Sequence, residues 1–242
     1  MTTARFYVSP TASLKGRLTL VGAEHHHISR VLRMRTGQAV QLLDGKGNIG
    51  HGILLEITSA HTVVMVEGSC RVQEERPRLY LFQALPQGTK MDSVVQWSVE
   101  LGAAVVAPFA CTRSRVLDSA LEKRVDRWRK IALESSRVAG RPFLPEVRKA
   151  RSWDDALREL AAMKSAIFAD EEGGAKPSVV LAGPLPDELG LMIGPEGGFC
   201  DEEREELVGS GIRPVTLGST LLRTETAGMV LLAAVRCHYG ML

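Results

Sequence analysis

The chain reads Leu191-Met192-Ile193-Gly194-Pro195-Glu196-Gly197-Gly198-Phe199 late in its 242 residues, a short apolar run that ends in a glycine-rich turn. The next apolar run leads into Leu217-Gly218-Ser219-Thr220-Leu221-Leu222-Arg223-Thr224-Glu225-Thr226-Ala227. Each run has the length of a buried strand, and each turn precedes a helix-like pattern. Because ligands bind beyond the carboxyl ends of strands in a parallel sheet, the two turns predict one pocket at neighbouring strand ends.

The first turn has the properties of a ligand-binding loop. Pro195 fixes its own φ angle, while the glycines allow positive φ and a close approach of the backbone to a ligand. The helix that follows starts with Asp201-Glu202-Glu203. Acidic side chains suit a helix start but disfavour a bound phosphate there, so the turn suits a neutral or cationic ligand. A plain link between a strand and a helix remains the alternative.

The second turn carries a lone basic residue beside the predicted start of the last helix. Arg223 needs an anion or another polar group as partner, so it is the first candidate for a residue that faces substrate. Thr224 or Thr226 is expected to cap the helix, and Glu225 suits its first turn. Asp170-Glu171-Glu172 follows another apolar run and indicates either a substrate-binding carboxylate cluster or a solvated turn.

The chain divides into two regions of different pattern. Residues 1–73 read as short strands and turns, which predicts a β-meander or small barrel. In residues 74–242 short apolar runs alternate with helical patterns, which predicts an α/β domain with a mostly parallel sheet. The stretch Met229–Val235 is apolar on nearly all sides, so its helix is expected to be deeply buried or to lie at a subunit interface.

Composition limits the class of protein. Hydrophobic residues make up 45% of the chain, which is ample for a core. No run reaches the roughly 18 apolar residues of a membrane span, and the first residues lack an apolar signal region. We therefore expect a soluble, cytoplasmic protein. The four cysteines form no CxxC pair, so free thiols are expected rather than disulfides or zinc ligands.

The net charge of +2 conceals an uneven distribution. Residues 113–151 hold twelve basic and five acidic residues, whereas residues 152–242 hold seven basic and fifteen acidic ones. The N-terminal region is also basic. Concentrated positive charge fits a phosphate-rich partner such as nucleic acid. Solvated helix faces are the alternative explanation.

Two other motifs are expected to be structural. Gly45-Lys46-Gly47-Asn48-Ile49-Gly50 matches the dinucleotide-binding pattern, but a β-rich run follows it instead of a helix, so a hairpin loop is predicted. That argues against a nucleotide-dependent oxidoreductase. His25-His26-His27 lies in a predicted short helix, where adjacent side chains point about 100° apart, so no metal site is expected.

The whole chain resembles the knotted SPOUT methyltransferases and, more narrowly, the RsmE family of small-subunit (16S) ribosomal RNA (uracil-N3)-methyltransferases. The two glycine-bearing turns are the most specific part of this resemblance. Further matching segments are Arg5-Phe6-Tyr7, residues 27–37, 43–47, 83–92, 100–102 and 140–147.

The resemblance implies a PUA-like barrel for residues 1–73 and a trefoil-knotted methyltransferase domain for residues 74–242. It also implies S-adenosyl-L-methionine as cofactor, ribosomal RNA of the small subunit as substrate and a homodimer with the active site near the interface. The implied cofactor-binding residues are Phe168, Ala169, Glu171, Gly194, Pro195, Glu196, Gly197, Leu217, Gly218 and Leu222. Arg223 and, more weakly, Glu225 are candidate catalytic residues, and the RNA-binding candidates are Arg5, Arg30, Arg33, Arg113, Arg115 and Arg141.

Some positions depart from the family's usual pattern. They are Gln87, Trp97, Thr112, Val138, Cys200 and Thr220. The cofactor turns are otherwise intact, so the departures bear on target recognition more than on methyl transfer. Two alternatives stay open: a SPOUT enzyme that acts on transfer RNA or another ribosomal site, and an RNA-binding relative without catalytic activity.

Overall fold

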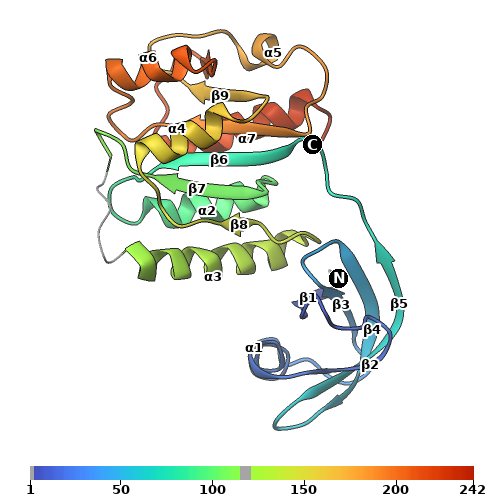
Figure 1. Ribbon diagram of the computed structural model, residues 1–242. Helices are drawn as coiled ribbons and strands as arrows, with labels where there is room; N and C mark the ends of the chain where they lie inside the picture. The colour runs from blue at the N-terminus through green and yellow to red at the C-terminus, as the bar shows by residue number, and fades with distance from the viewer. Residues whose placement is uncertain (1–2, 115–120) are drawn as a thin grey trace. The chain divides into compact units, whose positions relative to one another are not determined.

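The computed structural model describes residues 3–114 and 121–242, which form two compact units (Figure 1). The first unit comprises residues 1–74 and 136–144, and the second comprises residues 75–135 and 145–242. The segment 136–144 lies in the part of the chain that the sequence pattern assigns to the α/β region. The chain therefore crosses between the units three times, not once at a single linker. None of the helices in the described residues is long and apolar enough to span a membrane.

The first unit is built on a five-stranded sheet with the order β1-β3-β4-β5-β2. Its strands are β1 (Ala4–Tyr7), β2 (Gly16–Leu20), β3 (Ala39–Leu43), β4 (Asn48–Ile57) and β5 (Thr62–Arg71). All neighbours pair antiparallel except β1 and β3. Two short helical turns, α1 (Gly22–His26) and η1 (His27–Val31), follow β2. Phe6, Ile28 and Leu42 are fully buried in the core of this unit.

The glycine motif at residue 45 forms the hairpin between β3 and β4, as predicted. Asp44 Oδ1 accepts hydrogen bonds from the backbone N–H groups of Lys46 at 2.8 Å and Asn48 at 2.9 Å, which closes the turn. The segment 136–144 packs on this turn, because Gly47 N–H donates to the carbonyl of Pro142 at 3.0 Å. Gly47 has φ +96°, and a Cβ there would lie 2.5 Å from the Phe143 ring, so any other residue would be strained and crowded.

The second unit holds a six-stranded sheet with the order β11-β9-β10-β6-β7-β8, in which every neighbouring pair is parallel. Its strands are β6 (Arg78–Ala84), β7 (Val105–Phe109), β8 (Glu146–Val147), β9 (Ala166–Ala169), β10 (Glu188–Ile193) and β11 (Arg213–Val215). The helices are α2 (Lys90–Glu100), α3 (Leu121–Ala139), α4 (Trp153–Ala161), α5 (Pro177–Val180), α6 (Asp201–Gly209) and α7 (Thr224–His238). The last residues of α3, 136–139, belong to the first unit. The prediction of an α/β domain with a parallel sheet is confirmed.

Alternating side chains of the central strands supply a separate core on each face of this sheet. Leu79 and Leu81 of β6 belong to the core beneath α2, α3 and α7, whereas Tyr80 and Phe82 belong to the core beneath α4 and α6. The strands therefore read as continuous apolar runs, as expected for a sheet covered on both sides. Gly102 follows α2 with φ +84°, a left-handed conformation that glycine commonly supplies just after a helix.

The sheet order brings together the carboxyl ends of four strands. β11, β9, β10 and β6 are consecutive neighbours, so the turns after Val215, Ala169, Ile193 and Ala84 leave the same edge of the sheet. Helix α7 contacts both β6 and β10, and its first residue, Thr224, accepts a hydrogen bond from Gln83 of β6. The two glycine-bearing turns thus meet at this edge, as the sequence predicts.

Candidate functional site

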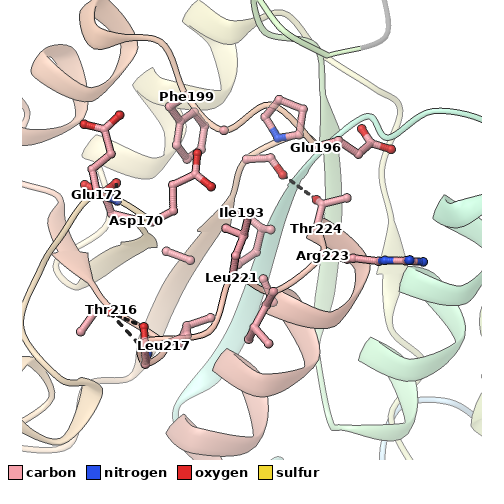
Figure 2. A pocket seen from close by; sticks show the side chains of 18 of the residues that line it. Asp170, Glu172, Ile193, Glu196, Phe199, Thr216, Leu217, Leu221, Arg223 and Thr224 are labelled. Atoms are coloured by element: carbon pink, nitrogen blue, oxygen red, sulfur yellow. Dashed lines mark hydrogen bonds between the residues drawn. The ribbon is translucent and has the colours of Figure 1, made fainter.

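A pocket of about 320 Å³ lies at that edge of the sheet, between the turns after β9, β10 and β11 and the first turn of α7 (Figure 2). It brings together most of the residues that the sequence singles out. Ala169, Glu171, Gly194, Pro195, Glu196, Leu217, Gly218, Leu222 and Arg223 all line it. The prediction of one pocket made by both turns is confirmed.

Three candidates lie outside the pocket lining. The Phe168 side chain is fully buried below it, with its ring centroid 5.9 Å from that of Phe199, which does line the pocket. Gly197 faces Arg113, whose guanidinium donates to the Gly197 carbonyl at 2.8 Å. Glu225 is in the first turn of α7, and its Oε2 is buried without a hydrogen-bond partner among the described residues.

The turn after β10 favours glycine because of its backbone conformation and its close packing. Gly198 has φ +66°, and a Cβ there would lie 2.3 Å from Glu171 Oε1. A Cβ at Gly194 would lie 3.2 Å from the Phe199 ring, which leaves little room for adjustment. The positive φ at Gly198 disfavours any other residue, and a side chain at Gly194 would require the Phe199 ring to shift.

Glu196 ties the same turn to the turn after β6. Its Oε1 accepts hydrogen bonds from Lys90 Nζ at 2.7 Å and from the Gln87 backbone N–H at 3.0 Å. Burial opposes the charged form of this carboxyl, but these hydrogen bonds outweigh burial and hold the pKa of Glu196 below its usual range. The hydrogen bond to Glu196 correspondingly raises the pKa of Lys90.

The acidic residues after β9 line the pocket, while Glu171 and Glu172 also remain exposed to solvent. Arg204 of α6 donates to Asp170 Oδ2 at 3.0 Å and also pairs with Glu172. One guanidinium therefore faces two carboxylates, and Glu171 adds a third acidic group to the lining. The electrostatic character of this wall is acidic, which suits a ligand with positive charge.

The start of α7 differs from the prediction. Arg223 occupies the N-cap position without a side-chain capping bond, and Thr224 is the first helical residue. Neither Thr224 nor Thr226 caps the helix, since both lie within it. The Thr224 hydroxyl instead donates to the Gly194 carbonyl at 2.5 Å. Figure 2 shows the Arg223 side chain directed away from Leu217 and Leu221, on the side of the pocket where Glu196 and Thr224 lie.

Several lining residues were not among the sequence candidates. Ile193, Phe199, Thr216, Ser219, Thr220, Leu221, Thr224 and Ala227 belong to the two turns or their flanks, so their position in the sequence was itself the signal. Arg204 carried no such signal, because it reaches the pocket from α6 through its ion pairs with Asp170 and Glu172.

The RNA-binding candidates are spread over both units. In the first unit Arg30 and Arg33 are exposed, whereas Arg5 donates to Gln41 Oε1 at 3.2 Å and to the Val138 carbonyl at 3.1 Å. Arg141 also lies in this unit, and its carbonyl accepts from the Tyr7 hydroxyl at 2.6 Å. Arg113 belongs to the second unit. Arg115 lies outside the described residues.

The histidine run does not converge. His25 is buried with Nδ1 2.8 Å from Thr62 Oγ1, His26 is exposed, and the His27 ring packs edge-on against Phe6. Over residues 3–114 and 121–242 no group of His, Cys, Asp and Glu is arranged to hold a metal ion.

Comparison with known proteins adds a family to this geometry. A family model described as RNA methyltransferase domain matches residues 73–236, and one described as RNA methyltransferase PUA domain matches residues 21–64. The ribosomal RNA small subunit methyltransferase E of Bacillus subtilis is 30% identical over 226 residues, which cover 90% of this chain and 88% of that protein. The protein of the same name from Synechocystis is 28% identical and covers 96% of this chain and 76% of its own length.

A solved structure agrees with both. The ribosomal RNA small subunit methyltransferase E of Neisseria gonorrhoeae, crystallised with bound S-adenosyl methionine, has a TM-score of 0.89 to this chain at 27% identity and 98% coverage of each chain. The predicted fold class, a SPOUT-type α/β domain with a PUA-like domain before it, is thereby confirmed. Because the RNA methyltransferase model spans more than half of the chain and the Bacillus relative matches most of it, this protein belongs to the family of the ribosomal RNA small subunit methyltransferases E.

Proposed function

We propose that this protein is an S-adenosylmethionine-dependent methyltransferase that methylates N3 of a uridine in small-subunit ribosomal RNA. The observation that carries the proposal is the pocket formed jointly by the 194–198 turn and the 216–224 segment, in a chain that matches a cofactor-bound relative over 98% of its length. The names of the relatives indicate small-subunit ribosomal RNA as the substrate. The resemblance to uracil-N3 enzymes indicates which base is methylated.

The residues of the pocket fit this cofactor. Ile193, Leu217, Leu222 and Ala227 provide an apolar wall for a flat base, and the turns offer backbone amides and carbonyls at close range. The acidic wall formed by Glu171 and its neighbours suits a positively charged sulfonium, whereas a phosphate would be repelled. S-adenosylmethionine supplies an activated methyl group when it is bound. The backbone near Phe168 and Gly197 would support these interactions from just outside the lining.

The protein's own groups would hold and polarise the target base. Methyl transfer is an in-line displacement, so alignment and exclusion of water are the main contributions of the enzyme. Uracil N3 must lose its proton, and the base then carries negative charge on its carbonyl oxygens. Arg223, at the rim beside Glu196, would donate to such an oxygen. Glu225, one oxygen of which is buried without a partner among the described residues, is the weaker candidate for the proton acceptor.

The RNA would be held by basic side chains of both units. Arg5, Arg30, Arg33, Arg113, Arg115 and Arg141 are the proposed phosphate-binding residues. A uridine in a loop or single strand would have to leave its stack to reach a pocket of this size. An enzyme that modifies ribosomal RNA works where ribosomes are, in the cytoplasm.

We further propose the homodimer and the trefoil knot that the resemblance implies. Val230 of α7 and Leu221 of the preceding turn are 37% and 74% exposed, and these apolar side chains are available to a second copy of the chain. Light scattering of the purified protein should give twice the chain mass, and a single-chain mass would contradict the dimer.

The function is tested by incubating the purified protein with labelled S-adenosylmethionine and small ribosomal subunits that lack the modification. Mass mapping of the RNA should give one 3-methyluridine. Methyl transfer to transfer RNA or to another ribosomal position would support a different target, for which the departure at Thr220 inside the pocket is the structural reason. Calorimetry without any cofactor binding would support an RNA-binding relative without activity.

A further inference from the structure

A polar side chain is buried at the end of β6, directly under the candidate site. Gln83 is fully buried, and its Nε2 donates to Thr224 Oγ1 at 2.8 Å and to the Ala84 carbonyl at 3.2 Å. Its Oε1 has no hydrogen-bond partner in the described part of the chain. A buried amide with an unpaired oxygen is costly, so an apolar residue would serve the core better. Its presence calls for a reason other than packing.

The Thr224 hydroxyl that Gln83 contacts already has its single donor in use. Thr224 is 5% exposed, accepts from Gln83 and donates its one hydrogen to the Gly194 carbonyl (Figure 2). Because a hydroxyl has a single donor, Thr224 cannot also donate to a ligand, although it lines the pocket. The peptide between Gly194 and Pro195 has no N–H, so this carbonyl is its sole polar group.

Gln83, Thr224 and the Gly194 carbonyl form a chain of hydrogen bonds, called the relay below. The orientation of the Gln83 amide determines which groups in this chain donate. Gln83 Nε2 is a donor, and it faces two acceptors, the Thr224 hydroxyl oxygen and the Ala84 carbonyl. The opposite orientation would let Thr224 donate to the amide oxygen and would leave the Gly194 carbonyl without its partner. On the other side, a Cβ on Gly228 would lie 3.5 Å from Gln83 Oε1, so the amide rests against a bare position one turn along α7 from Thr224.

We propose that Gln83 and Thr224 are positioning residues that set the distance between the cofactor-binding turn and Arg223. The relay joins the end of β6, the 194–198 turn and the first residue of α7. Arg223 immediately precedes Thr224, so whatever holds Thr224 also holds the backbone that carries the guanidinium. This inference rests on the proposed function, because it assigns those two groups to cofactor and target base.

The test compares two substitutions at one position. Thr224→Val removes the hydroxyl but keeps the shape, whereas Thr224→Ser keeps the hydroxyl. We expect kcat of the valine variant to fall by about tenfold to a hundredfold, the scale of a misplaced reacting group, while the serine variant stays within about threefold of the wild type. Cofactor affinity should fall less than kcat, which a general loss of folding would not produce. Circular dichroism checks that each variant is folded.

A second position makes the test independent of one substitution. Gln83→Met cannot donate and should reproduce the valine phenotype, and the double variant should be no worse than either single one, because both remove the same relay. Hydrogen exchange at residues 196–198 in the ligand-free protein should rise in the valine and methionine variants only.

Three results would overturn the relay: a valine variant as active as the wild type, equal damage by valine and serine, or additive losses in the double variant. If the wild-type protein neither binds S-adenosylmethionine nor methylates RNA, the proposed function fails instead. The exchange measurement, which needs no ligand, then still decides whether the relay orders the turn.

Discussion

Arg223 combines a fixed backbone with an exposed side chain. It is the N-cap of the last helix, and its exposed side chain lies on the Glu196 side of the pocket, away from the apolar wall. The backbone of this residue is therefore fixed by secondary structure while its guanidinium remains available. That combination suits a group that must meet a second substrate beside an already bound cofactor.

Replacing Arg223 with alanine should therefore separate catalysis from cofactor binding. We expect kcat to fall by about 10²-fold, as for loss of one donor to a developing oxyanion, with the cofactor Kd changed by less than about threefold. Single-turnover methyl transfer and calorimetry measure the two quantities. Arg158→Ala is the control, since this arginine is exposed on α4 and pairs with Asp155. Equal losses of rate and affinity would refute the assignment.

The Lys90–Glu196 pair should make the turn after β10 sensitive to acid. The pKa of Glu196 is lowered in the folded protein, so the pair contributes fully above the ordinary glutamate pKa and is lost as pH falls through the folded value. Protection of the Gln87 amide from hydrogen exchange, corrected for the intrinsic rate, should therefore decline only in acid. Glu196→Gln should abolish this dependence, and an unchanged acid response in that variant would show that another group is responsible.

At the scale of elements, local patterns located the strands that bound the site. The run Ala166-Ile167-Phe168-Ala169 coincides with β9 because polar residues flank it on both sides. The capping role of Thr224 was wrong for a reason outside local sequence: the Gly194 carbonyl, thirty residues earlier in the chain, takes its hydroxyl. Arg204 was missed for the same kind of reason, since its partners belong to the turn after β9.

The N-terminus of α6 offers a stability test at the same scale. Glu203 is 4% exposed and accepts from the backbone N–H groups of Thr112 at 2.7 Å and Cys200 at 3.1 Å. Glu203→Ala leaves both donors unpaired and should cost about 2–3 kcal/mol, which lowers Tm by roughly 5–10 °C. Glu205→Ala on the exposed side of this helix should change stability by less than about 0.5 kcal/mol. Calorimetric melting gives the Tm of both variants. Equal changes in Tm would show that the hydrogen bonds of Glu203 do not stabilise the start of α6.

At the scale of the whole molecule, the uneven charge predicts salt-dependent RNA binding. The logarithm of the binding constant should fall linearly with the logarithm of salt concentration. Replacing Arg30 and Arg33 with glutamine should reduce the slope by about 0.7–0.9 for each phosphate that is no longer neutralised, whereas Arg158→Ala should leave it unchanged. Filter binding at several salt concentrations measures the slope. Identical slopes in the wild type and both variants would show that Arg30 and Arg33 do not contact RNA phosphates.

The return of residues 136–144 to the first unit has a consequence for synthesis. Tyr7 and Gly47 leave the ribosome long before Arg141 and Pro142, whose carbonyls accept their hydrogen bonds. At about 5–20 residues per second, roughly 5–20 seconds pass between the emergence of Gly47 and that of its acceptor. During that interval the N-terminal sheet lacks its last segment, so this unit cannot finish folding first merely because its strands are translated first.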